Sequence, residues 1–183
     1  MTDILQLTAT ELGDAIDKGD LGSVEITTTY LDAITAHPLS PRIYSELTQD
    51  RALTEAKDAE ERARLGLRRS PLDGVPISWK DLYDTAGIKT EAGTLLLKNR
   101  VPSEDALVLK NATAMGAVCL GKTHMSELAF SGLGLNPMTA TSPCVHDKDA
   151  VSGGSSSGAA ASVAFGLAPV AIGSDTGGSV RIP

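Results

Sequence analysis

Two Gly-Gly-Ser turns stand between Val151 and Pro183, and they constrain the fold more than any other feature of the chain. The turns are Gly153-Gly154-Ser155 and Gly177-Gly178-Ser179, separated by small residues and a short apolar run. Glycine pairs let backbone amides approach another group closely, because no Cβ stands in the way. This pattern is typical of catalytic loops, so we expect a base for these serines elsewhere in the chain.

The composition is that of an ordinary globular protein. Apolar residues make up 42% and charged residues 21% of the 183 residues, which excludes disordered and fibrous classes. The net charge of −7 argues against broad binding to nucleic acid or anionic membranes, because both need clustered Lys and Arg. Cys119 and Cys144 lack metal-site spacing, and the sequence suggests neither a signal peptide nor a membrane span. We expect a reduced, cytoplasmic protein.

Residues 1–70 are predicted to be mainly helical. Thr8 followed by Glu11 forms a capping box for a short helix that ends near Gly19. A second helix is predicted from Ser23 to the His37-Pro38 boundary. After an extended piece over residues 43–47, residues 51–65 predict a long, solvated helix.

Residues 71–183 predict an α/β arrangement of helices and strands. Val75 to Trp79 reads as a strand that Lys80 closes. Residues 103–105 are predicted to cap a helix with Leu107, Val108 and Met115 on its apolar face, followed by a buried strand over residues 117–120. A helix of small residues over 159–166 and a buried strand over 170–172 lead to the second Gly-Gly-Ser turn.

Lys80 has two interpretations from its segment alone. A lysine that ends a buried strand is costly unless it is neutral or paired, so it either acts as a base or reaches solvent or the neighbouring Asp81. The histidines offer no base, since His37, His124 and His146 do not pair by spacing with a serine or cysteine nucleophile. Lys80 is therefore the best candidate.

A phosphate-binding motif is also present by pattern, but its context is wrong. Residues 116–123 (GAVCLGKT) satisfy G-x-x-x-x-G-K-[ST]. Such a loop follows a strand and opens a helix, whereas here the first glycine follows a helix and the intervening residues are strand-like. We therefore reject nucleotide binding.

Four blocks carry a family resemblance: residues 72–81 (LDGVPISWKD), 121–127 (GKTHMSE), 153–158 (GGSSSG) and 173–183 (GSDTGGSVRIP). In order and spacing they resemble the amidase signature family over about 110 residues. The resemblance implies an α/β fold with a mixed sheet covered by helices. It also implies a serine amidohydrolase that works without metal or organic cofactor.

The resemblance implies a Ser-cisSer-Lys triad made of Ser179, Ser155 and Lys80. Ser179 would be the nucleophile, and Ser155, after a cis peptide bond, would relay the proton to Lys80. Lysine can accept that proton only when neutral, so its pKa must be lowered by burial.

The resemblance also implies an oxyanion hole, which consists of the backbone amides of Thr176, Gly177, Gly178 and Ser179. Two neighbouring charged residues are also assigned: Asp175 is expected to fix the loop amides, and Arg181 either holds a substrate carboxylate or pairs with an internal acid.

Family members extend well beyond the nucleophile, so residues 1–183 resemble the N-terminal part of one amidase signature domain. Within it, residues 1–70 would be a helical region and residues 71–183 the first part of the catalytic core.

Three functions remain open. The first is an amidase for a small or medium carboxamide, and the second is the catalytic A subunit of a glutamine-dependent aminoacyl-tRNA amidotransferase, acting with partner subunits. The third is a catalytically silent scaffold. Arg181-Ile182-Pro183 favours the hydrolases, because the amidotransferase subunits more often carry glutamine between Arg and Pro. No direct contact with nucleic acid is expected, and a homodimer is one possible assembly.

Overall fold

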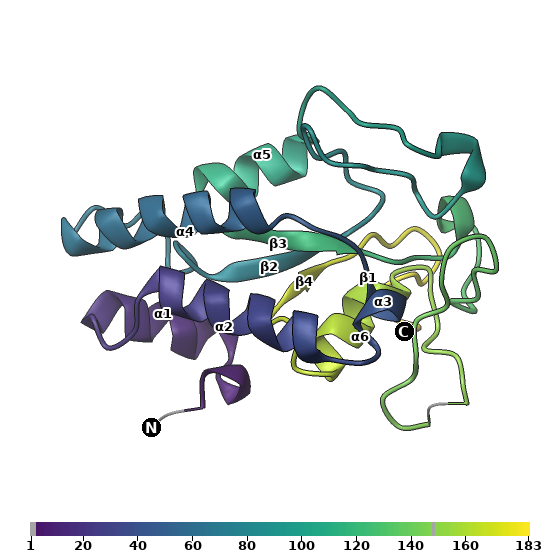
Figure 1. Ribbon diagram of the computed structural model, residues 1–183, viewed down its shortest axis with the longest axis horizontal. Coiled ribbons are helices and arrows are strands. Elements are labelled where there is room, and N and C mark those ends of the chain that lie inside the picture. The colour runs from purple at the N-terminus through teal and green to yellow at the C-terminus, as the bar shows by residue number, and fades with distance from the viewer. Residues whose placement is uncertain (1–2, 148) are drawn as a thin grey trace.

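The computed structural model describes residues 3–147 and 149–183, and its centre is a four-stranded mixed sheet (Figure 1). The strands β1 (Tyr44–Leu47), β2 (Pro76–Lys80), β3 (Val118–Thr123) and β4 (Ala171–Ile172) lie in the order β1-β3-β2-β4. Strand β2 is parallel to β3 and β4, whereas β1 is antiparallel to β3. The carboxyl ends of the three parallel strands therefore meet at one edge of the sheet, where open α/β sheets commonly bind ligands.

The helices of the first third begin and end close to their predicted bounds: α1 (Ala9–Lys18), α2 (Ser23–Ala36) and α4 (Gln49–Arg64). The capping box of α1 is confirmed, since the Thr8 hydroxyl accepts the Glu11 amide and the Glu11 carboxylate accepts the Thr8 amide. Gly19 ends α1 in the left-handed conformation, with φ of 75°. Two short helical pieces, η1 (Ile4–Gln6) and α3 (Ser40–Ile43), belong to this region, and two more, η2 (Leu95–Leu97) and η3 (Glu127–Ala129), lie further along the chain.

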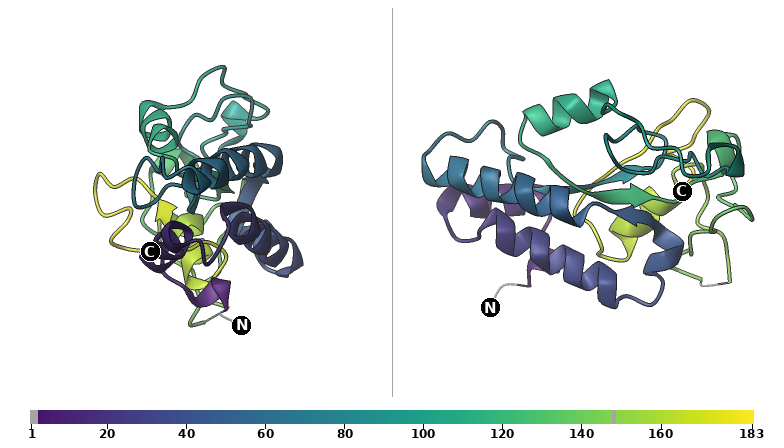
Figure 2. Two further views of the ribbon diagram at one scale, coloured as in Figure 1. Left: turned by 90° about the vertical axis from the view of Figure 1, so that its left-hand side faces the viewer. Right: turned by 45° about the horizontal axis from the view of Figure 1, so that its top comes forward.

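The two faces of the sheet are covered by different helices, as the two views of Figure 2 show. On one face, α1, α2 and α6 (Ser157–Ala164) share the largest core cluster with side chains from the sheet, including Leu120. On the other face, Leu109 of α5 (Leu107–Ala114) packs against Ile77, Trp79 and Cys119. Lys80 therefore ends a strand that is buried from both sides.

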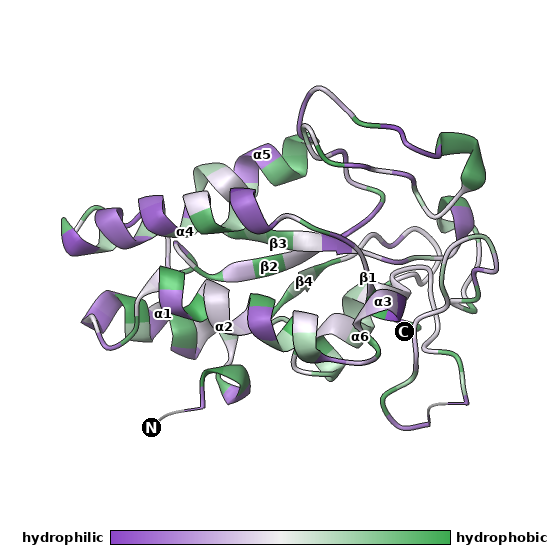
Figure 3. Ribbon diagram, in the orientation of Figure 1, coloured by the Kyte–Doolittle hydropathy of each residue, from purple (hydrophilic) through white to green (hydrophobic). Residues whose placement is uncertain are grey.

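Helix α4 matches the prediction of a solvated helix. It is largely hydrophilic along its length in Figure 3, and the residues that it buries are three alanines, Ala52, Ala56 and Ala59. The small side chains let it pack closely, and Ala52 and Ala56 contact Val118 of β3. Helix α4 thus covers the sheet with little apolar surface of its own.

Three local predictions are wrong. Residues 103–105 do not cap α5, because its N-cap is Ala106 and the Asp105 carboxylate instead binds Arg51 and the Ala86 amide. The apolar side chains assigned to its inner face, Leu107, Val108 and Met115, are exposed, and Leu109 is the buried one. Strand β4 is only half-buried, because it lies at the edge of the sheet with β2 as its one partner in the described chain.

Candidate active site

Lys80 is the last residue of β2, and its side chain is fully buried. Side chains alternate along a strand, so Lys80 lies on the same face as Ser78, whose hydroxyl is 2.8 Å from Ser162 Oγ on α6. The Lys80 amine donates hydrogen bonds to Ser155 Oγ at 2.6 Å and to Ser174 Oγ at 2.8 Å. The fold therefore brings Lys80 into direct contact with one of the two serines that the sequence pairs with it.

Ser155 lies in the loop before α6 and is also fully buried. The peptide bond from Gly154 to Ser155 is cis. A Cβ at Gly154 would lie 2.6 Å from Ser126 Oγ and 2.7 Å from the Gly134 nitrogen, so the loop requires glycine there. The Ser155 carbonyl accepts a hydrogen bond from the Ser126 amide at 3.2 Å. These close contacts fix the loop that presents the Ser155 hydroxyl to Lys80.

Ser179 lies on the turn after β4, next to the loop that carries Ser155. Its carbonyl accepts a hydrogen bond from the Ser156 amide at 3.1 Å. Ser156 also exchanges two hydrogen bonds of 3.2 Å with Ser174, one through each backbone group of Ser174. The Ser179 side chain is half-buried, and its hydroxyl makes no hydrogen bond within the part of the chain that the structure describes. The two Gly-Gly-Ser turns are therefore adjacent, with no hydrogen bond between their predicted catalytic hydroxyls.

Asp175 organises the turn that carries Ser179. Its carboxylate accepts the amides of Gly178 at 2.7 Å, Val180 at 3.0 Å and Arg181 at 3.3 Å. The Arg181 guanidinium adds two contacts, Nε at 3.0 Å and Nη2 at 2.9 Å. The pair with Arg181 and the loop amides together hold the pKa of Asp175 well below its usual range. Asp175 thus fixes loop amides, and Arg181 pairs with an internal acid, as one of its two predicted interpretations required.

Among the residues that the structure describes, one of the four backbone amides assigned to an oxyanion hole already donates a hydrogen bond, and the other three do not. The Gly178 amide is engaged by Asp175, and Gly178 adopts a positive φ of 128° that favours glycine. The amides of Thr176, Gly177 and Ser179 donate to no group among residues 3–147 and 149–183. Three of the four predicted donors therefore have no hydrogen-bond acceptor among the residues that the structure describes.

The charge state of Lys80 follows from its surroundings. Burial lowers the pKa of the Lys80 amine from 10.5 to about 8, and the nearby Asp175 charge opposes this shift. The interpretations of Lys80 as a solvent-reaching or Asp81-paired lysine are wrong, because the side chain is inaccessible and its two hydrogen-bond partners are serine hydroxyls. A neutral hydroxyl stabilises an ammonium less than a carboxylate does. Lys80 can therefore lose its proton near neutral pH.

Asp81 instead binds a second buried lysine, Lys122 of β3. The Lys122 amine donates to Asp81 Oδ1 at 3.0 Å and to Thr90 Oγ1 at 2.9 Å. The other Asp81 oxygen accepts the Glu91 amide at 3.1 Å. Burial lowers the pKa of the Lys122 amine, and the Asp81 carboxylate opposes that shift.

Sequence reasoning missed both Ser174 and the Lys122–Asp81 pair. Lys122 appeared in the rejected phosphate-loop pattern and in the family block 121–127, and residues 118–123 form a strand, as that rejection assumed. Ser174 stands two residues after the end of β4, so its place at the carboxyl edge of a predicted parallel sheet was the available signal.

A shallow groove of about 160 Å³ lies beside this site but does not contain it. Small apolar residues of α6 and β4 line it, among them Ala159, Val163 and Ala171. Neither Lys80, Ser155 nor Ser179 contributes to its wall. The groove, which Ser156 also lines, is therefore a surface hollow next to the site.

Two further observations concern the described residues only. Across residues 3–147 and 149–183, no group of three or more His, Cys, Asp or Glu side chains is placed to hold a metal ion. Among the helices in those ranges, none combines the length and apolar character needed to cross a bilayer.

Comparison with known proteins gives consistent relatives. The chain is 39% identical over 183 residues to the A subunit of the glutamyl-tRNA(Gln) amidotransferase of Chloroflexus aurantiacus, covering 100% of this chain and 38% of that protein. The peptide amidase of Stenotrophomonas maltophilia superposes with a TM-score of 0.87 at 36% identity, over 95% of this chain and 37% of the other. A fatty acid amide hydrolase superposes with a TM-score of 0.88 at 29% identity, over 96% of this chain and 31% of the other.

The family follows from the extent of the match. The chain spans only 31% to 38% of the length of these relatives. Within that span, the sequence model described as Amidase matches residues 25–183, which include the whole sheet and both Gly-Gly-Ser turns. The resemblance seen in the four sequence blocks and the mixed α/β fold are both confirmed, and the chain belongs to the Amidase family.

Proposed function

We propose that the protein to which this chain belongs is a serine amidohydrolase that cleaves linear amide C–N bonds. The observation that carries the proposal is the 2.6 Å contact between the Lys80 amine and Ser155 Oγ, with Lys80 fully buried and bound only to hydroxyl groups. A buried amine without an anionic partner is a base that can work near neutral pH. A catalytically silent scaffold would not require this arrangement.

The proposed reaction begins with proton transfer along three residues. Ser155 gives its proton to the neutral Lys80 amine and accepts the proton of Ser179, whose oxygen then attacks the carbonyl carbon of the amide. The Ser156 amide, next to Ser155, binds the Ser179 carbonyl at 3.1 Å, which holds the two serine-bearing loops together. The tetrahedral intermediate collapses as the C–N bond breaks, and the Lys80 proton returns through Ser155 to the departing nitrogen.

The amides of Thr176, Gly177 and Ser179 would bind the negative oxygen of this intermediate. Donors that are already oriented lower the barrier by several kcal/mol, because no reorganisation is needed during the reaction. The Asp175 carboxylate contributes indirectly, since its contacts to Gly178, Val180 and Arg181 hold the turn. The resulting acyl-enzyme is then hydrolysed by water, which loses its proton through the same relay. The proposal needs no metal or organic cofactor.

The experiment uses the complete natural protein. A fluorophosphonate probe should label Ser179, and Ser179→Ala should abolish both labelling and amide hydrolysis. In the control variant Ser156→Ala, which changes the neighbouring loop, the probe should still label Ser179. Labelling of another residue, or amide hydrolysis that survives Ser179→Ala, would refute the proposal. Fluorophosphonate labelling of Ser179 would also exclude the silent-scaffold alternative.

A second candidate is the catalytic A subunit of a glutamine-dependent aminoacyl-tRNA amidotransferase. The specific observation in its favour is the 39% identity to such a protein over the whole chain. The same three residues would then release ammonia from glutamine, and partner subunits would contact the tRNA. Glutaminase activity measured with and without candidate partners decides between the two, because activity that requires partners favours the amidotransferase.

The remaining expectations for the whole protein are part of this proposal. We infer that residues 1–183 form the N-terminal part of one domain, with the helical region 1–70 packed onto the core 71–183, because Leu12 and Ile26 share a cluster with Val75 and Leu120. A cytoplasmic location, a small amide substrate and either a homodimer or partner subunits complete the proposal. Arg181 remains a candidate for binding a substrate carboxylate, since its side chain is 74% exposed despite the pair with Asp175.

A further inference from the structure

We propose that the buried Lys122–Asp81 ion pair is a positioning device for the Lys80 amine, acting through the backbone at the end of β2. The inference rests on the proposed function, because it takes Lys80 as the base. Asp81 directly follows Lys80, so any displacement of Asp81 moves the peptide that carries the amine. Both members of the pair are buried, with side-chain exposures of 0% for Lys122 and 5% for Asp81.

Every polar group of Asp81 has a partner. One carboxylate oxygen binds Lys122 and the other accepts the Glu91 amide. The Asp81 amide donates to the Thr123 carbonyl at 3.0 Å, and its carbonyl accepts the Ala92 amide at 3.1 Å. The residue after Lys80 is thus held by the neighbouring strand and by the segment that follows β2.

The pair also fastens that segment to the sheet. Residues 81–106 connect β2 to α5 with only one short helical turn, so they have little regular structure of their own. Lys122 reaches from β3 to both Asp81 and Thr90, which joins the start of this connection to the strand beside Lys80. Lys122 is paired with Trp79 in the sheet and therefore lies on the face opposite Lys80. The ion pair therefore holds the backbone at Lys80 from the opposite face of the sheet and does not contact the Lys80 amine.

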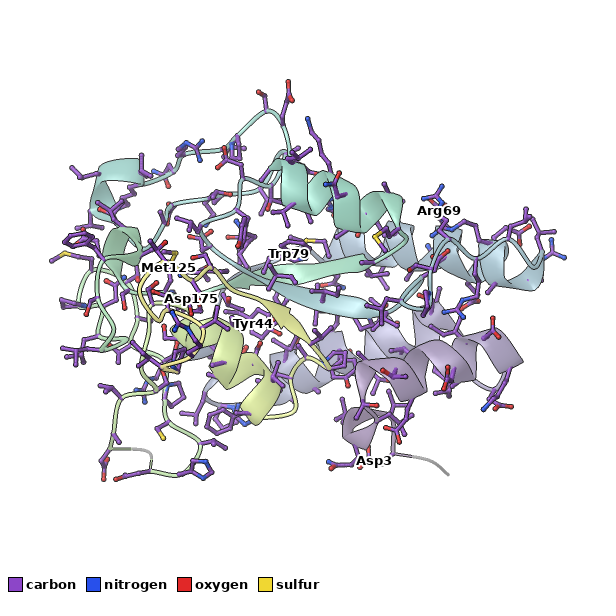
Figure 4. The ribbon with its side chains drawn as sticks, turned by 180° about the vertical axis from the view of Figure 1, so that it is seen from behind. Asp3, Tyr44, Arg69, Trp79, Met125 and Asp175 are labelled. Carbon is purple, nitrogen blue, oxygen red and sulfur yellow. The ribbon has the colours of Figure 1, made fainter. Side chains whose placement is uncertain are left out.

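A matched control lies at the other end of the same strand. Asp73 is fully buried just before β2, accepts hydrogen bonds of 3.0 and 2.6 Å from Arg62, and accepts the Arg69 amide at 2.8 Å. Figure 4 shows Arg69 toward one end of the molecule and Asp175 of the site loop toward the other, with Trp79 of β2 between them. The Arg62–Asp73 pair is therefore also an ion pair on a fully buried carboxylate, although the Arg62 side chain is 18% exposed and that of Lys122 is 0% exposed, and it is remote from Lys80.

The experiment compares the rates at which fluorophosphonate labels Ser179 in the complete natural protein, at a temperature where every variant is folded by circular dichroism. A displacement of about 1 Å near reacting groups can cost about a hundredfold in rate, so we expect Lys122→Met to slow labelling about tenfold or more. Asp73→Asn should slow labelling by about twofold or less, even if this variant lowers the unfolding temperature as much as Lys122→Met does. Equal slowing by both variants would overturn the inference.

A double-mutant cycle separates positioning from general damage. When Lys80→Ala has already removed the amine, Lys122→Met should change the residual labelling rate by less than about twofold, because the group it positions is gone. A full additional loss on that background would overturn the inference. If Lys122→Met does not fold, K122M combined with D81N removes both charges, and labelling at the wild-type rate by this folded variant would equally overturn it.

Failure of this inference is distinguishable from failure of the proposed function. Labelling of Ser179 in the wild type and its absence in Ser179→Ala test the function alone. Wild-type labelling rates in the folded Lys122 and Asp81 variants would leave that function intact and remove only the positioning role.

Discussion

Lys80 and Lys122 occupy neighbouring parallel strands near the same edge of the sheet, and both are fully buried. Lys122 has a carboxylate partner, Asp81, and a hydroxyl partner, Thr90. Lys80, on the opposite face, has the hydroxyls of Ser155 and Ser174. A carboxylate favours the ammonium form, whereas hydroxyls alone do not compensate for burial of a charge. Burial lowers the pKa of both amines, so it is the contacting partner that distinguishes the ion-paired lysine from the candidate base.

The largest expected effect comes from replacing each lysine by methionine. Lys80→Met should lower amide hydrolysis by about 10²- to 10⁴-fold, because it removes the proposed base. It should lower the free energy of unfolding by less than about 2 kcal/mol, since it removes two hydrogen bonds to neutral groups. Lys122→Met should instead lower the free energy of unfolding by about 3–5 kcal/mol, because it leaves the Asp81 carboxylate buried without its charge partner.

Urea titrations and initial-rate assays on the complete natural protein check both halves of this prediction. The comparison between the two lysines fails if Lys80→Met destabilises the protein as much as Lys122→Met does. It also fails if Lys80→Met leaves hydrolysis unchanged.

The pH dependence gives the second test. With the pKa of Lys80 lowered from 10.5 to about 8, the unfolded chain binds more protons than the folded protein between these pH values. The Lys80 contribution to the free energy of unfolding therefore increases as the pH rises from about 8 to 10.5. The rate of Ser179 labelling should also rise with pH, with a midpoint near pH 8, because only the neutral Lys80 amine accepts a proton.

Unfolding by urea across this pH range, with Lys80→Met as the reference, isolates the contribution of Lys80 from other titrating groups. Identical pH slopes in the wild type and Lys80→Met would show that Lys80 has an ordinary pKa. In that case the comparison would fail, because the hydroxyl partners of Lys80 would leave its amine as strongly protonated as a carboxylate partner does.

The smallest expected effect belongs to Ser174→Ala. The change removes one of the two hydroxyls that contact the Lys80 amine, a neutral hydrogen bond worth about 1 kcal/mol, so hydrolysis should fall by about two- to tenfold. Thr90→Val is the matching change at Lys122 and should leave the rate within about twofold, since Asp81 still holds that amine. Initial rates of both variants at saturating substrate decide this, and equal losses would contradict it.

Much of the local structure could be predicted because its causes are local. The α1 capping box, the end of α2 before His37 and the strand closed by Lys80 all follow from neighbouring residues. The inner face of α5 could not be predicted, because Leu109 packs on Trp79 and Cys119 of strands that are remote in sequence. The edge position of β4 has the same cause, since strand order is not encoded in the strand itself.

The sequence by itself named Lys80, Ser155 and Ser179 as candidates for the site and marked where the backbone needs glycine. Gly154 and Gly178 stand where a side chain would collide or the backbone takes a positive φ, so the two turns are marked in the chain. The same blocks were sufficient to place the chain in its family, which the match over residues 25–183 confirmed.

Only the tertiary structure decided which partner each charged group has. Lys80 meets Ser155 across 75 positions and Ser174 across 94, and Lys122 meets Asp81 across 41. The sequence offered Asp81 to Lys80 because the two are adjacent, but adjacent side chains of a strand point to opposite faces. Pairing between strands then gave Asp81 to Lys122 and left Lys80 with hydroxyls, so burial lowers the pKa of Lys80 to about 8 and only the nearby charge of Asp175 opposes the shift.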